Sequence, residues 1–203
     1  MSKLYAWLSY ISGNTPIALI FLFNVGYDNI GYAVIGKLDE VHFTEIFLAA
    51  ILVIITSFSS YLMIKYFNDA INRLKNGNGG EAATVSNLQV EKIFSSGAIT
   101  YYILPFASFI VGDDIIKNLV ALFILGAIFG QIYVKERMTI YSPILCLFGY
   151  VVFSCDREFE RQGPKRRIKV LVKNPESIVM GNKCGLVMQS IDNTVYIATL
   201  KET

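Results

Sequence analysis

The stretch IFLAAILVIITSFSSYLMI, residues 46–64, contains no charged side chain and decides the fold class of this chain. At about 1.5 Å of rise per residue, a helix of this length crosses the roughly 30 Å hydrocarbon core of a bilayer. Glu45 precedes the stretch and Lys65 follows it, so charge returns at both ends. The stretch therefore predicts a transmembrane helix and, with it, a membrane protein.

The composition agrees with a membrane protein and excludes several functions. Of the 203 residues, 54% are hydrophobic and the mean hydropathy is +0.49, both high for a soluble domain. The net charge of +2 is too small to favour nucleic-acid binding by the whole chain. Cys146, Cys155 and Cys184 have no paired spacing, so neither a disulfide framework nor a zinc site is expected. No cleavable signal peptide is expected, because Ser12–Asn14 interrupts the apolar stretch after Lys3.

Three further apolar runs predict three more transmembrane helices. The four predicted spans are residues 15–34, 45–66, 94–111 and 115–134. We expect the second helix to continue past the membrane, because Phe67, Ile71 and Leu74 keep helical spacing. The glycine-rich segment 76–80 should end it. Pro105 is expected to kink the third span.

The distribution of lysine and arginine predicts the orientation. These residues concentrate in short loops on the cytoplasmic side of a membrane. The connection between the second and third spans holds Lys65, Arg73, Lys75 and Lys92, whereas the connections on either side of it are mainly acidic. We therefore expect residues 67–93 to form a cytoplasmic loop, and four spans then place both termini inside.

A fifth apolar run, residues 138–153, is open to two interpretations. It is short for a span, and Ser142, Pro143 and Gly149 interrupt it. If it crossed the membrane, the most basic segment of the chain would lie outside. The charge distribution therefore favours a short helix capped by Ser142 beneath the membrane, followed by a strand, over a fifth span.

The last part of the chain has strand periodicity. Ile168, Val170 and Val172 recur at every second position beside charged residues, which is strand periodicity. GLVMQSI and TVYIATL flank a turn at Asp192-Asn193 and predict a hairpin. The predicted fold is an α-helical polytopic membrane protein with four transmembrane helices, both termini inside, and a small β-rich cytoplasmic C-terminal module. The predicted membrane domain is residues 1–137, and the submembrane helix and β-rich module are residues 138–203.

The residues do not favour catalysis. His42 is the only histidine, and the segment NGNGG lacks the lysine of a phosphate-binding loop. Asp28 is the one candidate for carrying charge across the core, and a position at the membrane edge explains it better. We therefore expect no enzyme, no metal site and no cofactor. A passive pore stays open; its candidate lining residues are Asn24, Ser57, Ser60, Thr100 and Ser108.

Gly126 and Gly130 form a GxxxG pattern in the fourth predicted span. Small residues let helix backbones approach closely in lipid, where the hydrophobic effect does not drive association. The pattern is consistent with contact between subunits of a homo-oligomer, with packing inside one subunit, or with no special role.

The basic residues Lys165, Arg166, Arg167 and Lys169 also have three readings. They could simply retain the tail in the cytosol. They could contact anionic lipid headgroups, at roughly 1 kcal/mol per basic residue near the surface. They could bind an acidic partner or nucleic acid.

Two stretches resemble the membrane component of the bacterial Kiwa anti-phage system. The first, SNLQVEKIFSSGAITYYILPFASFIVGDD, residues 86–114, leads through a proline-bearing span into an acidic turn. The second, IYSPILCLFGYVVFSCD, residues 140–156, is a Ser-Pro-apolar-Gly-Tyr segment that leads into a strand. The plan of four spans and a small soluble C-terminal module is similar too.

The resemblance implies a non-enzymatic sensor and anchor in the bacterial inner membrane. Such a protein oligomerises, responds to phage attachment or injection, and recruits a soluble DNA-binding effector to the cytoplasmic face. The expected partners are membrane lipids, further copies of the chain and the effector, without direct nucleic-acid binding. The alternative is an oligomeric channel or pore-forming effector, which would conduct ions in a planar bilayer.

Overall fold

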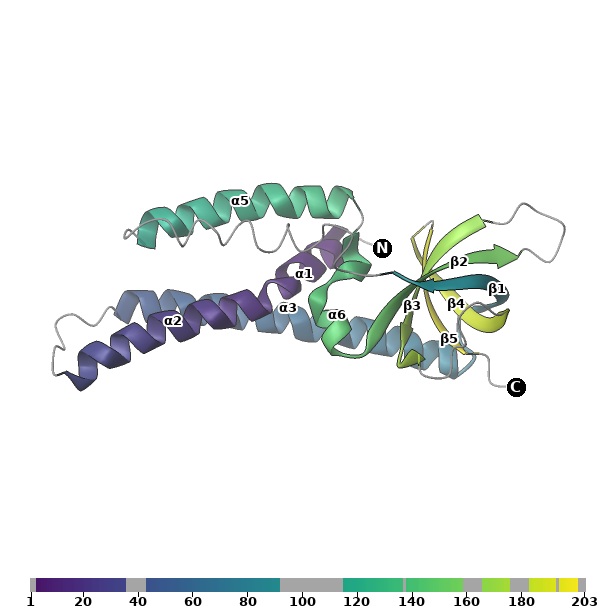
Figure 1. The fold of residues 1–203 in the computed structure, drawn as a ribbon, viewed down its shortest axis with the longest axis horizontal. Helices are drawn as coiled ribbons and strands as arrows, with labels where there is room; N and C mark the ends of the chain where they lie inside the picture. The colour runs from purple at the N-terminus through teal and green to yellow at the C-terminus, as the bar shows by residue number, and fades with distance from the viewer. Residues whose placement is uncertain are drawn as a thin grey trace. The chain divides into compact units, whose positions relative to one another are not determined.

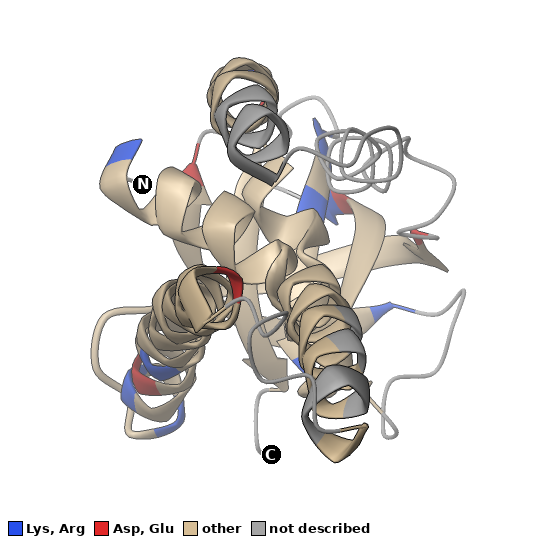
Figure 2. Cartoon of the chain, turned by 90° about the vertical axis from the view of Figure 1, so that its left-hand side faces the viewer, with Lys and Arg blue, Asp and Glu red and all other residues tan. Residues whose placement is uncertain are grey.

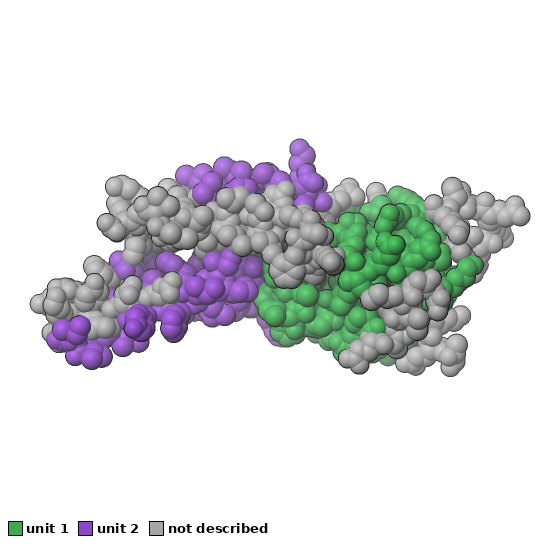
Figure 3. Space-filling model, viewed as in Figure 1, with its two compact units in different colours: residues 1–2, 63–96, 140–203 green, residues 3–62, 97–139 purple. Residues whose placement is uncertain are grey.

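The computed structural model describes residues 3–35, 43–91, 115–136, 138–158, 166–175, 183–192 and 194–200. The chain forms two compact units, which Figure 3 distinguishes by colour. The barrel unit comprises residues 1–2, 63–96 and 140–203, and the helical unit comprises residues 3–62 and 97–139.

The helical unit contains α1 (Lys3–Gly13), α2 (Thr15–Val34), the first part of α3 (Phe43–Lys75) and α5 (Ile115–Lys135) (Figure 1). Tyr10 of α1 and Tyr133 of α5 are buried against each other, with ring centroids 5.4 Å apart. The Ser9 hydroxyl lies 3.1 Å from the Tyr133 hydroxyl and donates to the carbonyl oxygen of Thr139 at 2.9 Å. The buried polar groups of this helix pair therefore bond to each other.

Large apolar side chains on α2, α3 and α5 are exposed. The exposed fraction is 70% for Phe23, 65% for Phe47 and 80% for Phe123. Within the described residues, two helical stretches are long and apolar enough to cross a membrane, Lys3–Tyr27 and Phe43–Lys75. A shorter apolar stretch, Phe123–Lys135, belongs to α5.

The predicted fold of four transmembrane helices is therefore wrong. Two stretches of the described chain meet the length and hydropathy requirement, and the strands form a closed β-barrel that includes residues 81–90 instead of a module confined to the C-terminal residues. The expected third span, 94–111 with Pro105, lies outside the described residues, as does His42. The predicted continuation of the second helix is confirmed, because α3 runs unbroken to Lys75.

Five strands close into a barrel. They are β1 (Glu81–Val90), β2 (Tyr150–Glu158), β3 (Arg166–Lys173), β4 (Cys184–Asp192) and β5 (Val195–Leu200). The strand order is β1-β2-β3-β5-β4, and β4 pairs back with β1. The β3–β5 pair is parallel, and all other pairs are antiparallel. This is the topology of an OB-type barrel, a five-stranded Greek-key barrel.

Alternate residues of the strands point into the barrel, as the sequence periodicity predicts for β3 and for the β4–β5 hairpin. All five strands contribute to one buried core, whose fully buried members are Val85, Leu88, Phe153, Cys155, Ile168, Val170, Val172, Leu186, Met188 and Ala198. Each large aliphatic side chain in such a core contributes about 1.5–3 kcal/mol. Closure of the barrel also removes the open sheet edges that favour aggregation.

Strand β1 closes the barrel, although the sequence predicted a loop over residues 67–93. Its first half pairs with β4 and most of its length pairs with β2. The register with β2 shifts between Ser86 and Gln89, and Asn87 between them has a φ of 55°. This bulge bends the strand so that it can pair on both sides.

The outer face of β2 and β3 is covered by the chain itself. Val152 and Leu171 lie opposite each other on that face, yet their exposed fractions are 1% and 0%. The helix α6 (Pro143–Leu147) contacts β2, and Phe67 of α3 packs edge-on against Tyr150 with ring centroids 6.0 Å apart. OB-type barrels often bind oligonucleotides on this face. In this chain, helices of the same polypeptide occupy it.

Residues 138–153 form the short helix and strand that the charge distribution favours. The 3₁₀ turn η4 (Met138–Tyr141) leads to α6, whose N-cap residue is Ser142. The Ser142 side chain makes no capping hydrogen bond. Pro143 instead suits the first helical position, where a backbone N–H would have no partner. Strand β2 then begins at Tyr150.

Candidate functional site

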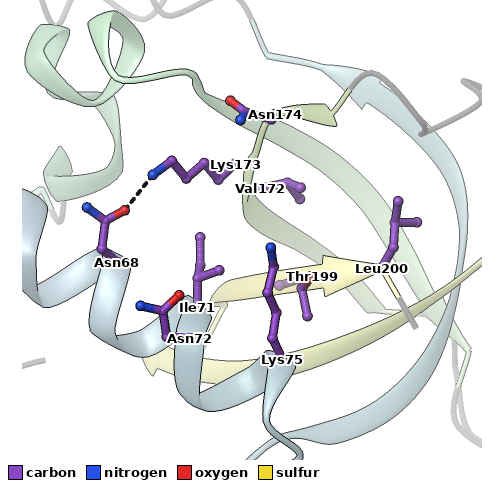
Figure 4. A pocket seen from close by; sticks show the side chains of 10 residues that line it. Asn68, Ile71, Asn72, Lys75, Val172, Lys173, Asn174, Thr199 and Leu200 are labelled. Carbon is purple, nitrogen blue, oxygen red and sulfur yellow. Dashed lines mark hydrogen bonds between the residues drawn. The ribbon is translucent and has the colours of Figure 1, made fainter. Parts of the chain in front are cut away.

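A polar pocket lies in the barrel unit where α3 meets the barrel (Figure 4). Because β3 and β5 are parallel, their carboxyl ends lie at the same edge of the barrel, and the last turns of α3 complete the wall. The cavity volume is about 420 Å³. The lining residues are Asn68, Ile71, Asn72, Lys75, Val172, Lys173, Asn174, Ala198, Thr199 and Leu200.

The Asn68 side-chain oxygen organises one wall of the pocket. It accepts a hydrogen bond from Lys173 Nζ at 2.7 Å and another from the Tyr150 hydroxyl at 2.9 Å. The Lys173 ammonium also lies 5.6 Å from the centre of the Tyr150 ring. Burial raises the pKa of Tyr150, so its hydroxyl keeps its proton and donates throughout the physiological range. These contacts fix the direction of the Lys173 side chain.

The charged side chains that line the pocket are all positive. Lys75 and Lys173 are its charged lining residues, and the other eight are neutral. Lys75 forms no ion pair with the described part of the chain, and its ammonium points from α3 into the pocket (Figure 4). A concave site with two cations and several amides favours an anionic ligand.

A strained corner holds one edge of the pocket. Asn174 has a φ of 51°, and its backbone N–H donates to the carbonyl oxygen of Gly149 at 2.9 Å. Gly149 has a φ of 77°, and a Cβ there would lie 2.5 Å from the Asn174 side-chain oxygen. Because both its φ and its neighbour exclude a side chain, this position requires glycine.

A second polar cluster lies in the barrel unit between η4 and β3. The Tyr141 hydroxyl donates to Glu91, and Lys169 Nζ donates to the Tyr141 hydroxyl. Lys169 also forms an ion pair with Glu91 at 3.3 Å. Burial, followed by the hydrogen bond and charge of Glu91, raises the pKa of Tyr141. The cluster joins the end of β1, η4 and β3, which is a structural role.

The predicted basic contact residues are therefore not equivalent. Lys169 is engaged in the cluster with Tyr141 and Glu91. Arg166 and Arg167 are exposed, and Arg167 Nε donates to the Ser154 hydroxyl at 2.9 Å. Lys165 lies outside the described residues. Contact with lipid or a partner stays a prediction, and it rests on the two arginines.

The two glycines of the GxxxG pattern also differ. A Cβ at Gly130 would lie 2.7 Å from Cη2 of Trp7 and 2.9 Å from Cε1 of Tyr10, so α1 packs directly on this glycine. A Cβ at Gly126 would meet no described atom within 4 Å. Gly130 therefore serves packing inside the helical unit. Contact between subunits stays a prediction, and it rests on Gly126.

Of the candidate pore residues, two have described side chains. Ser60 is buried, and its hydroxyl lies 2.8 Å from the Thr15 hydroxyl and donates to the carbonyl oxygen of Thr56 at 2.9 Å. This hydroxyl serves packing between α2 and α3. Ser57 is exposed.

The sequence interpretation missed the pocket. Lys173 and Asn68 are 105 residues apart, and no local pattern joins them. One signal was present, because Asn68, Asn72 and Lys75 recur at helical spacing on the polar continuation of α3. A polar stripe of this kind on a helix that also carries apolar residues indicates a face directed at something other than lipid.

The comparisons with known proteins agree with the resemblance of the two quoted stretches. The family model for anti-phage protein KwaA matches residues 5–197. Kiwa protein KwaA of Escherichia coli O55:H7 (strain RM12579 / EPEC) is 28% identical over 99 residues, which are 49% of this chain and 50% of that protein. The alignment thus spans about half the length of this curated relative. No solved structure matches the chain. Because the family model covers nearly all of the sequence, the chain belongs to the KwaA family of anti-phage proteins.

Proposed function

We propose that this chain is a non-enzymatic sensor and anchor of anti-phage defence in the bacterial inner membrane. In this proposal it is a multi-pass, homo-oligomeric protein whose barrel and C-terminus face the cytoplasm. It responds to phage at the membrane and recruits a soluble effector protein to the barrel. Membership of an anti-phage family supports the role in defence.

The observation that carries the proposal is the continuity of α3. One helix of 33 residues contains the charge-free stretch 46–64, and its last turns bury Phe67, Ile71 and Leu74 in the barrel unit. Its charged residues are Glu45 in the first turn and, after the charge-free stretch, Lys65, Asp69, Arg73 and Lys75. Figure 2 shows that most of each described helix is tan, with few Lys, Arg, Asp or Glu residues. A helix without a break transmits a displacement along its axis. We propose that α3, which contributes residues to both units, is the element through which the barrel senses a disturbance of the membrane.

The exposed apolar side chains support insertion in a membrane. Phe47, Ile54 and Phe58 are exposed along α3, and burial in lipid removes this surface from water at about 25 cal/mol per Å². The orientation follows from the basic residues, because Lys65, Arg73 and Lys75 lie at the end of α3 that joins the barrel.

Reporter fusions after Thr203 test the location and the orientation. We expect a green fluorescent protein fused there to fluoresce in the membrane fraction, and an alkaline phosphatase fused there to be inactive. Phosphatase activity would place the barrel in the periplasm and would contradict recruitment of a cytoplasmic effector. Recovery of the full chain in the soluble fraction would contradict the membrane anchor.

Recruitment is tested with the exposed arginines of β3. Replacing both Arg166 and Arg167 by glutamate should weaken co-purification of the soluble partner and lower protection against phage, because the pair presents two cations to an acidic surface. Lys3→Glu reverses an exposed charge on α1 and should leave both readouts unchanged. Equal loss in the control would show that the effect is one of total charge.

Conductance in planar bilayers separates the sensor from the channel alternative. The sensor and anchor should bind its partner without passing ions. Ion currents that depend on the full chain would support a channel and contradict our proposal.

A further inference from the structure

We propose that the pocket between the last turns of α3 and the ends of β3 and β5 binds a phosphate-type anion. The source of the phosphate is either a phosphorylated small molecule or the headgroup of an anionic phospholipid. Both sources present a phosphate oxyanion to the pocket. The small molecule reaches it from solution, whereas the headgroup reaches it from the membrane surface.

The lining residues of the pocket suit an oxyanion. Phosphate oxygens accept hydrogen bonds from ammonium, amide and hydroxyl groups. The pocket offers two ammonium groups, from Lys75 and Lys173, together with the side chains of Asn72 and Thr199. The lining holds no carboxylate that would repel an anion or neutralise the lysines.

Lys173 is positioned before any ligand binds. Lys173 is held by Asn68, which is itself held by the Tyr150 hydroxyl. A lysine fixed before binding loses less side-chain freedom when the ligand arrives. Lys75, by contrast, points into the cavity without a described ion-pair partner (Figure 4). The Lys173 ammonium is thus held in place before binding, and the Lys75 ammonium can form an ion pair with the bound anion.

The volume and the position of the pocket define the ligand. A volume of about 420 Å³ lies within the usual range for small-molecule sites, so it accommodates a phosphate with part of its attached group. The charge-free stretch of α3 ends at Ile64, and Asn68, the first pocket residue of this helix, follows one turn later. At about 1.5 Å per residue, the lining residues of α3 lie about 6–16 Å beyond that end. Headgroups extend about 5–8 Å beyond the hydrocarbon core on each side. With α3 inserted as proposed above, the near end of the pocket lies at headgroup depth.

Binding of inorganic pyrophosphate to the purified full chain in detergent tests the soluble source. We expect saturable binding by calorimetry, weakened at least tenfold by the double change Lys75→Gln and Lys173→Gln. Because loss of Lys173 also removes its bond to Asn68, Asn72→Asp provides a second test. It places a negative charge in the lining, leaves that bond intact, and should weaken binding by a similar factor. Lys65→Gln removes a lysine of the same helix outside the pocket and should bind as the wild type does.

The lipid source is tested with the same variants in nanodiscs, by native mass spectrometry of retained lipid. A headgroup site predicts that wild-type chain retains phosphatidylglycerol over phosphatidylcholine, that pyrophosphate displaces the retained lipid, and that Asn72→Asp abolishes the preference. This lipid arm rests on the insertion of α3 in the membrane, whereas the pyrophosphate arm does not. Pyrophosphate binding without lipid retention identifies a soluble ligand. Absence of both, or binding that is equal in wild type and Asn72→Asp, would overturn the proposal.

Discussion

Gly130 of α5 lies directly against aromatic side chains of α1. A Cβ there would collide with the Trp7 ring and lie 2.9 Å from Tyr10 Cε1, whereas a Cβ at Gly126 would meet no atom of the described residues within 4 Å. We expect Gly130→Ala to destabilise the helical unit by about 1–3 kcal/mol, because an aromatic pair must move. Gly126→Ala is the matched control and should stay within about 1 kcal/mol of the wild type.

Trp7 is the only tryptophan of the chain, so its fluorescence reports this contact during thermal unfolding in detergent. A Gly130→Ala chain that unfolds with the wild-type profile would show that α1 does not pack on this glycine.

The difference between the two glycines also gives a test of contact between subunits. Gly126→Leu should reduce the size of the assembly without altering the Trp7 signal, since of the two glycines Gly126 is the one that no described atom contacts.

The buried thiol of Cys155 should lower the free energy of unfolding at alkaline pH. The residue lies in the barrel core, and burial, with a smaller contribution from the charge of Asp156, raises its pKa from 9.0 to about 12. The folded chain therefore holds the thiol proton more tightly than the unfolded chain. This contribution is complete below pH 9 and is lost as the pH rises toward 12.

The measurement is the urea midpoint of the barrel between pH 8 and about pH 11, compared for wild type and Cys155→Ala. The variant loses packing at every pH, but its midpoint should fall less steeply above pH 9 because it lacks the thiol. Tyr141 and Tyr150 also have raised pKa values, so both proteins should lose stability in alkali. If the urea midpoint of both proteins fell equally steeply with pH, the pKa of Cys155 would be the same in the folded and the unfolded chain, and the prediction would be wrong.

At the scale of elements, α3 has two chemically different halves. Phe58 lies in the charge-free stretch and is 60% exposed, whereas Phe67 is fully buried and packs on Tyr150. Phe67→Ala should destabilise the barrel by about 3–5 kcal/mol, the usual cost of deleting a buried aromatic side chain. Phe58→Ala makes the same chemical change on the same helix and should leave the barrel unaltered.

Hydrogen exchange of peptides from β2 and β3 measures this difference, because it reports the barrel separately from the helices. Faster exchange in Phe67→Ala alone is the expected result. Equal exchange in both variants would mean that α3 does not support the barrel. The transmission of a membrane disturbance through α3 would then lose its physical basis.

The strands differ in how far the sequence could predict them. Alternation identified β3 through Ile168, Val170 and Val172, and it identified the β4–β5 hairpin. β1 was missed because its bulge at Asn87 interrupts the alternation, so that Val85 and Leu88 face the core at a spacing of three instead of two. The helix of α3 was predicted to its end, because its apolar residues keep one period through Leu74.

At the scale of the whole molecule, the barrel is assembled from distant parts of the chain. β1 precedes the described part of α5, and β2 follows it, so their pairing joins residues such as Thr84 and Glu158. Local periodicity cannot reveal such a pairing. The same reason explains the pocket, whose walls come from α3, β3 and β5. The residue types of the site were visible in the sequence, but the strand order that brings them together was not.

This division predicts that the C-terminal segment does not fold by itself. Residues 138–203 contain β2–β5 but lack β1, so β2 and β4 would each lose a partner and Val85 and Leu88 would leave the core. We expect this fragment to show no cooperative thermal transition and to aggregate through its open edges. A second fragment should fold, in which residues 63–91 are joined to 140–203 by a short glycine-serine linker. Glu91 and Tyr141 are hydrogen-bonded, so the ends to be joined are close.

Circular dichroism and amide chemical-shift dispersion distinguish the two fragments. The joined fragment should show dispersed strand resonances and a cooperative transition, and Val85→Asp within it should abolish both, because a charge would enter the barrel core without a partner. Cooperative unfolding of residues 138–203 alone would mean that the four C-terminal strands form a complete domain. β1 would then be an accessory strand, and the last turns of α3 would be joined to the barrel without being needed for its fold.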